Sequence, residues 1–450
     1  MTTYSAVRTT GIYCRPGCGA KPLMENVRTF ELAAAAEAAG YRACLRCRPY
    51  RVAGTVPDEA PELVCRAVQL IIGGALDGAP TANAAAGEAG LAARLGLSAR
   101  HLRRMFHDHL GVTPDQFARS RRAHLARRLL DDTDLTIADV AFASGFGSLR
   151  QFNRAMREVF RSTPRELRDR RRRTDRLVAD GGLVLRMPFT PPYDWPAMLA
   201  FLAEHAIPGV ESVEGDVYRR TIALDGEPGL LEIGPGGADH LLLRAHLPYW
   251  EGVIHVVERA ARLVGLDVEP ALATAQLAVD PVIGPLIQQR PGLRIPGTWG
   301  PFETAVQAVV EDLATTPATW STSTPEPRAL LAELVATHGT PVPGLGHGLT
   351  HGFPSAEALA AGQYAGSVAG DVLVQLSKEV AAGHITLLAG DQLVTSLTAV
   401  PGVSRRAAQY IALRLGARDA APIDHEASEN WRPWRSLATV HLLAEARTHT

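Results

Sequence analysis

The sequence predicts a multidomain α+β protein with three parts: a small cysteine-rich domain, an all-α domain and a larger α+β domain. Three observations predict this division. Two close pairs of cysteines lie within residues 1–51, a helix-turn-helix pattern occurs twice about fifty residues apart, and short β-type runs begin after residue 182. With 450 residues and 46% hydrophobic composition, the chain can form several domains with ordinary cores.

The cysteine pairs predict a zinc domain over residues 1–51. Cys14 and Cys18 are spaced C-x3-C, and Cys44 and Cys47 are spaced C-x2-C. Four thiolates at these spacings can surround one zinc ion, and so short a domain has too little core to fold without such a site. The alternatives are two disulfides or a purely structural zinc site. Residues 1–5 lack a signal-peptide pattern, so we expect a cytoplasmic protein with reduced thiols.

A zinc-bound thiolate can also attack electrophilic carbon, because it stays deprotonated at neutral pH. The segments RTTGIYCRPGC, ENV and YRACLRCRP, within residues 6–50, resemble the amino-terminal domain of Ada-type DNA repair proteins. The resemblance implies that Cys14 accepts a methyl group from a methylphosphotriester in DNA, which makes the chain a DNA-methylphosphotriester:cysteine methyltransferase. A thioether does not hydrolyse, so each molecule would act once.

The same transfer predicts a switch in DNA affinity. Turning one thiolate into a neutral thioether reduces the negative charge of the site, and binding through phosphates depends steeply on charge. Arg15, Arg46 and Arg48 lie beside the ligands, so we expect them to hold the DNA backbone. Residues 1–175 contain 28 Lys+Arg and 18 Asp+Glu, which also directs the first part of the chain toward nucleic acid.

Residues 52–89 are expected to contain a linker, a helix at LVCRAVQLII and a Gly/Ala-rich loop. The helix is too short for a membrane span and contains Arg66, so no membrane partner is expected. Cys65, the fifth cysteine, stands alone in this apolar segment. We expect it to be packed rather than reactive.

Residues 90–170 predict two helix-turn-helix units joined by a helix at PDQFARSRRAHLARRLL. The first has a turn at Gly96 and a second helix capped by Ser98. That helix has two faces: apolar Leu102, Met105, Phe106 and Leu110, and polar Arg100, Arg103, Arg104 and His107. In the second unit a helix from Ile137 leads to a turn at Gly145 and a helix after Ser148. Its inward face is expected to hold Leu149, Phe152, Met156 and Val159, and its outer face Arg150, Gln151, Asn153, Arg154 and Arg157.

Exposed arginines on one helix are often only a solvated face, but two such units favour DNA binding. The GF and FR-x-x-P-x-x-L-R endings make this segment similar to the AraC-type DNA-binding domain. The resemblance implies that each recognition helix enters a major groove, the two grooves lying about 34 Å apart. Double-stranded DNA is therefore the expected partner, with RNA polymerase as a candidate second one.

A charged linker is expected at residues 171–182, followed by an α+β domain at 183–290 and a helical domain at 291–450. The segments PPYDWPAMLAFL, DPVIGPLIQQRPGLRIPGTWGPFE and NWRPWRSLATVHL resemble AlkA-type 3-methyladenine DNA glycosylases. The resemblance implies a helix-hairpin-helix bundle, with the turn at Pro401 and Gly402 contacting phosphate. It also implies a flipped base in a pocket lined by Tyr410.

By the same resemblance, Asp424 is the carboxylate that supports cleavage of the glycosidic bond. The chain departs from this family at Ser404, Arg406 and Leu443, where glycine and two pocket aromatics are expected, and it lacks about four helical turns after Asp424. Asp424 as a helix N-cap, and WRPWR as core packing with solvated arginines, are the alternatives. The sequence therefore predicts an alkylation-responsive repair protein and transcription regulator, whose rear domain either excises alkylated bases or only binds lesions. The non-enzymatic alternative is a zinc-dependent regulator.

Overall fold

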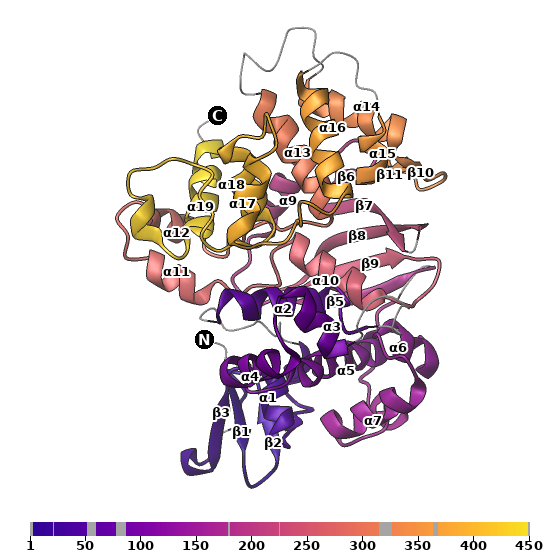
Figure 1. Ribbon diagram of the computed structural model, residues 1–450. Helices are drawn as coiled ribbons and strands as arrows, with labels where there is room; N and C mark the ends of the chain where they lie inside the picture. The colour runs from indigo at the N-terminus through magenta and orange to yellow at the C-terminus, as the bar shows by residue number, and fades with distance from the viewer. Residues whose placement is uncertain are drawn as a thin grey trace. The chain divides into compact units, whose positions relative to one another are not determined.

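The computed structural model describes residues 3–20, 22–51, 60–77, 87–178, 181–224, 226–314, 326–362 and 368–448 (Figure 1). Its contacts divide the chain into two compact units. The first unit contains residues 1–190, 236–258 and 266–269, and the second contains residues 191–235, 259–265 and 270–450. The expected linker and loop in residues 52–59 and 78–86 lie outside the described residues. Helices and strands occur in both units, so the predicted multidomain α+β fold class is confirmed.

The first unit begins with a small sheet that has the strand order β3-β1-β2-β4. Strand β1 pairs antiparallel with β2 and β3, whereas β2 and β4 are parallel. The elements of this part are β1 (Tyr4–Val7), β2 (Ile12–Cys14), β3 (Val27–Phe30), α1 (Ala33–Ala38) and β4 (Arg42–Ala43), with 3-10 turns at Met24–Asn26 and Pro49–Arg51. The carboxyl ends of β2 and β4 therefore meet at one edge of the sheet.

The helical part of the first unit follows the expected double helix-turn-helix order (Figure 1). Its helices are α2 (Glu62–Ile72), α3 (Gly87–Arg94), α4 (Ala99–Leu110), α5 (Pro114–Asp132), α6 (Ile137–Ala143), α7 (Leu149–Phe160) and α8 (Pro164–Asp169). Gly96 and Gly145 have φ values of 68° and 81°, which few other residues adopt, so each fixes its turn. The Ser98 side chain accepts from the His101 N–H, and the Ser148 side chain from the Gln151 N–H.

Buried ion pairs connect the cysteine-rich part to the end of α5. Asp131 and Asp132 are the last residues of α5 and are 0% and 1% exposed. Asp131 accepts from the Tyr50 hydroxyl at 3.0 Å, and Asp132 accepts from Arg51 at 2.9 Å. Arg186 Nη1 donates to Asp132 at 2.7 Å. We call Asp131, Asp132 and their partners the α5 carboxylate cluster.

The segment expected to be a charged linker is part of this packing. Asp175 is 7% exposed, and both its carboxylate oxygens accept from the Arg48 guanidinium at 2.7 Å. The Leu177 N–H also donates to the Asp132 carbonyl at 2.9 Å. Burial raises the pKa of Asp175, but the hydrogen bonds from Arg48 and from the Arg172 N–H outweigh it and lower the pKa. Residues 172–177 are therefore held in place, because this charged segment pairs with oppositely charged residues of the part of the chain that precedes it.

Two strands complete the first unit. Strand β5 (Leu183–Pro188) pairs antiparallel with β9 (His240–His246), with Leu185 opposite Leu243. The buried side chains of β5 alternate only in part, since Leu183, Val184 and Leu185 are all buried. Helix α5 contacts β5 and places Asp132 beside Arg186.

The second unit combines strands and a helical bundle. Strand β7 (Val217–Leu224) pairs antiparallel with β6 (Glu211–Glu214) and β8 (Glu227–Gly237). Its helices include α9 (Trp195–Glu204), α11 (Ala271–Leu277), α12 (Ile283–Gln289), α13 (Pro301–Ala314), α14 (Pro327–His338), α15 (Ala356–Ala360), α16 (Val368–Ala381), α17 (Asp391–Thr398), α18 (Arg405–Arg414) and α19 (Arg435–Thr448). A short pair, β10 (Thr340–Pro341) and β11 (His351–Gly352), follows α14. Helix α10 (Val253–Leu263) follows β9, and its residues are divided between the two units.

Apolar side chains of the bundle form one large core, which includes Val306, Leu334, Leu373, Leu397 and Ile411. A smaller core contains Trp431 and Trp434, so the interpretation of WRPWR as core packing is confirmed. Its arginines are only partly solvated: Arg432 and Arg435 both pair with Asp419, and the Arg435 side chain is 14% exposed. Among the described residues, none of the helices combines the length and apolar composition that crossing a membrane requires.

The α5 carboxylate cluster generates a stability prediction. Asp131→Asn removes the buried carboxylate charge that pairs with Arg127, so we expect a loss of about 3 kcal/mol or more in the unfolding free energy of the first unit. Asp134→Asn is the matched control, because the Asp134 side chain is 50% exposed and pairs with Arg171 and Arg176 at the surface. Its expected loss is under about 1 kcal/mol. Urea denaturation followed by circular dichroism measures both, and equal losses would contradict the assignment.

Candidate functional site

The four paired cysteines come together at the edge of the small sheet. Cys14 ends β2, and Cys44 follows β4 directly. The Cys44 N–H donates to the Tyr13 carbonyl at 2.9 Å, which continues the parallel pairing and sets the two cysteines side by side. Cys18 reaches the same place through a turn in which its N–H donates to the Arg15 carbonyl at 3.3 Å.

The sulfur geometry fits one tetrahedral metal ion. The Sγ atoms of Cys14, Cys18, Cys44 and Cys47 all lie within 4.8 Å of one another, and all five cysteines of the chain are free thiols. Zinc–sulfur bonds of about 2.3 Å require sulfur separations below this limit. The four residues thus present the donor set of a structural or thiolate-reactive zinc site, and the disulfide alternative finds no support.

The pKa shifts of the clustered thiols also favour a bound cation. Burial raises the pKa of the Cys14 thiol, and the nearby charges of Cys47 and Cys44 raise it further. Burial likewise raises the pKa of Cys47, to about 12. At Cys44 burial also raises the pKa, but hydrogen bonds from the Cys47 and Arg46 N–H groups outweigh it and lower the pKa. Several thiolates can share this space only when a positive ion compensates them.

A polar cluster that the sequence analysis missed lies beside the cysteine site. Glu37 Oε1 accepts from the Tyr13 hydroxyl at 2.6 Å and is 2.6 Å from His124 Nε2. The Tyr13 hydroxyl is also 3.3 Å from His124 Nε2. Tyr13 precedes Cys14, Glu37 belongs to α1 and His124 to α5, so these contacts tie the strand that carries Cys14 to the central helix. No local sequence pattern indicates contacts over such separations.

The three arginines expected to hold the DNA backbone have different environments. Arg46 is exposed and Arg15 is partly exposed, so both can meet a phosphate. Arg48 has φ of 51°, and its side chain is 11% exposed and bonded to Asp175 by two hydrogen bonds. In this arrangement the Arg48 guanidinium binds a carboxylate inside the protein and does not face a ligand.

The first recognition helix, α4, has the faces that the sequence predicts. Leu102, Phe106 and Leu110 are buried and Met105 is partly buried. The predicted polar side chains are all exposed: Arg100, Arg103, Arg104 and His107. Of these, Arg103 pairs with Glu88 of α3.

The second recognition helix, α7, differs from expectation at its first residue. Phe152, Met156 and Val159 are buried as predicted, but Leu149 is 42% exposed, so its expected inward position is wrong. The reason is geometric, since Leu149 opens the helix and the buried stripe begins only with the following turn. On the outer face Arg150, Gln151, Arg154 and Arg157 are exposed and Asn153 is partly exposed.

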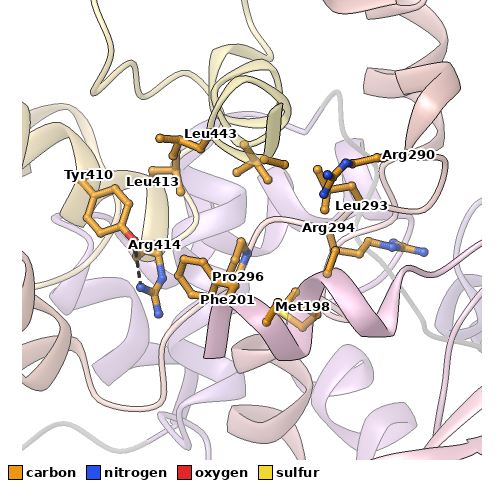
Figure 2. A pocket seen from close by; sticks show the side chains of 14 residues that line it. Met198, Phe201, Arg290, Leu293, Arg294, Pro296, Tyr410, Leu413, Arg414 and Leu443 are labelled. Atoms are coloured by element: carbon orange, nitrogen blue, oxygen red, sulfur yellow. Dashed lines mark hydrogen bonds between the residues drawn. The ribbon is translucent and has the colours of Figure 1, made fainter. Parts of the chain in front are cut away.

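A pocket in the second unit contains the residue expected to line a base site. Figure 2 shows Tyr410 of α18 and Leu443 of α19 around a cavity of about 190 Å³. Phe201 of α9 and Arg414 also line it, and the Arg414 guanidinium lies 4.8 Å from the Phe201 ring centre. The sequence analysis missed Phe201, although it lies in the segment PPYDWPAMLAFL that carries the family resemblance.

The predicted hairpin joins α17 to α18. Gly402 has φ of 91° and is exposed, and a Cβ atom there would lie 2.3 Å from Val372 Cγ2, so only glycine fits. Within the part of the chain that the structure describes, the Gly402 N–H has no hydrogen-bond partner. Ser404 caps α18 by accepting from the Ala407 N–H at 3.0 Å, and Arg406 pairs with Asp312.

Asp424 is exposed and does not line this pocket. It caps no helix either, because the N–H of Ala427 donates to His425 Nδ1 and only a 3-10 turn, Ser428–Trp431, follows. The N-cap alternative is therefore wrong. Residues 424–431 contain no element other than this 3-10 turn, and Asp424 is open to solvent.

Comparison with known proteins identifies three domains. Residues 2–50 match the metal binding domain of Ada, residues 91–170 a helix-turn-helix domain, and residues 184–300 the AlkA N-terminal domain. The zinc domain, the regulator domain and the glycosylase-like domain expected from the sequence are confirmed.

One relative matches nearly the whole chain, and two others match parts of it. A probable bifunctional transcriptional activator/DNA repair enzyme AlkA of Mycobacterium tuberculosis is 37% identical over 97% of this chain and 91% of its own length. DNA-3-methyladenine glycosylase 2 of Escherichia coli is 29% identical over 56% of this chain and 94% of its own. The bifunctional transcriptional activator/DNA repair enzyme Ada of Escherichia coli is 31% identical over 36% of this chain and 43% of its own.

The sulfur cluster predicts the metal content of the protein. Purified full-length protein should hold one zinc per chain, and Cys18→Ser should lower the content severalfold because three ligands bind far more weakly than four. Cys65→Ser, which removes a thiol outside the cluster, should keep the full content. Metal analysis after desalting decides between them. If both variants held equal zinc, the metal would not be bound by these four cysteines.

Proposed function

Because the chain belongs to the family of bifunctional transcriptional activator/DNA repair enzymes, we propose that it transfers methyl groups from DNA methylphosphotriesters to Cys14 and regulates transcription. The observation that carries the proposal is the position of Cys14, which ends β2 inside a cluster of four sulfurs. Double-stranded DNA is the partner in both roles, and RNA polymerase is the proposed second partner of the regulator.

The reaction needs only the sulfur and the substrate. The Cys14 Sγ attacks the methyl carbon, the carbon–oxygen bond breaks, and the phosphodiester leaves with the electron pair. A bound zinc ion would keep the thiol deprotonated and neutralise its neighbours. Arg15 and Arg46 support binding of the phosphate beside the reacting sulfur, whereas Arg48 keeps the loop in place through Asp175.

The transfer also supplies the regulatory signal. A thioether carries one negative charge less than a thiolate, so the site repels the DNA backbone less after the reaction. Helices α4 and α7 of the same unit present exposed arginines, which supports sequence-specific binding. We therefore propose that methylated protein binds its promoter more tightly than unmodified protein.

Methyl acceptance is tested by mass spectrometry. DNA methylated on its phosphates should add one methyl group to the Cys14 peptide of the full-length protein, and Cys14→Ser should abolish the transfer. Cys65→Ser should accept the methyl group as the original protein does. Transfer that persists without Cys14 would refute the assignment, and loss in both variants would indicate damage to the fold.

The second unit supports a further activity, the excision of alkylated bases. The specific observation is the cavity that brings Tyr410, Phe201 and Leu443 together. Aromatic faces in such a cavity suit a flipped, electron-poor base. Against this, Asp424 is exposed outside the cavity lining, so the alternative is a domain that binds lesions without cleavage.

Release of free 3-methyladenine from methylated duplex DNA separates these alternatives. If the domain is a glycosylase, the original protein releases the base and Asp424→Asn lowers the rate by about 100-fold, the size of a lost electrostatic contribution. Glu426→Gln, which removes a neighbouring exposed carboxylate, should leave the rate unchanged. Binding of methylated DNA without release would establish the lesion-binding alternative.

A further inference from the structure

The two recognition helices are related by an offset of fifty residues. Ser98 and Ser148 both cap their helices, and Arg100 and Arg150 both stand at the second helical position. Between cap and arginine the two helices differ, because α4 has Ala99 and α7 has Leu149. The most buried apolar residues of the first turns, Leu102 and Phe152, correspond as well.

Leu149 extends an apolar side chain from the polar face of α7. It is 42% exposed, whereas Phe152 and Met156 on the same helix are fully buried. The first turn of a second helix in a helix-turn-helix unit is the part that approaches base edges in the major groove. Leu149 therefore stands where a side chain contacts bases, without a function in the core.

Of the polar side chains near Leu149, two make hydrogen bonds within the described residues and two do not. Asn153 Nδ2 donates to the Leu149 carbonyl at 2.8 Å, and Arg154 Nε donates to Glu158 at 2.8 Å. The Asn153 side chain therefore lies along the first turn beside Leu149, whereas Arg154 is held toward the carboxyl end of the helix. In the described part of the chain, the side chains of Arg150 and Gln151 make no hydrogen bond or ion pair, so they remain available beside Leu149.

We propose that Leu149 determines specificity by contacting the C5 methyl group of a thymine, next to the base or phosphate contacted by Arg150. Thymine is the base that presents an apolar group in the major groove. The matching residue of α4 is Ala99, whose side chain is shorter, so the proposal concerns the half-site of α7. This inference rests on the proposed DNA binding by α7.

The test removes one methyl group from the DNA. Full-length protein selects its preferred duplex from a random pool, and each thymine of that duplex is then replaced by deoxyuridine, which keeps the hydrogen-bonding groups. One replacement should weaken binding about fourfold, the effect of losing one buried methyl contact. Leu149→Ala should weaken binding of the thymine duplex equally and be insensitive to the replacement.

Together with Leu149→Ala, two further variants distinguish the possible outcomes. Leu63→Ala removes a leucine of α2 that is 36% exposed and should keep the sensitivity to deoxyuridine. Arg150→Ala tests whether α7 meets DNA at all. If it weakens binding while no thymine replacement has an effect, the thymine contact is overturned and DNA binding by α7 stands. If the protein selects no sequence, the inference and the proposed regulator function both fail.

Discussion

The carboxylates at the end of α5 hold the first unit together. Asp131 and Asp132 are buried at the end of the helix against which α7 and α8 pack, and their partners come from the cysteine-rich part and from β5. A buried carboxylate without its cation is costly, so these pairs favour one arrangement over alternatives. Burial raises the pKa of Asp132 despite Arg51 and Arg186, which shows how far this group is removed from water.

The local features of the first unit could be predicted from the sequence. Cysteine spacing specified the sulfur cluster, and glycine turns with serine caps specified both helix-turn-helix units. The contacts of Arg48 could not be predicted, because a charge beside a ligand resembles a phosphate contact until its partner 127 residues later is placed. Leu149 was misassigned because helical periodicity does not distinguish the first residue of a helix from its interior.

In the second unit some residues lie where the family resemblance implies, and others do not. Tyr410 and Leu443 line one cavity, as their motif positions imply, because backbone packing keeps such positions in place when side chains change. Arg406 pairs with Asp312 at the position where a pocket aromatic was expected. The position of Asp424 depends on the segment that follows it. Because this segment is shortened, the sequence does not predict the direction of the Asp424 carboxylate.

The contacts of Tyr13, Glu37 and His124 have a consequence for how such proteins can recombine. A cysteine domain transplanted onto another regulator would separate Glu37 from His124 and leave His124 of the donor protein without its carboxylate. The same exchange would separate Arg48 and Arg51 from the carboxylates that pair with them. An exchange that separates the cysteine-rich part from α5 is therefore expected to cost the first unit these buried contacts.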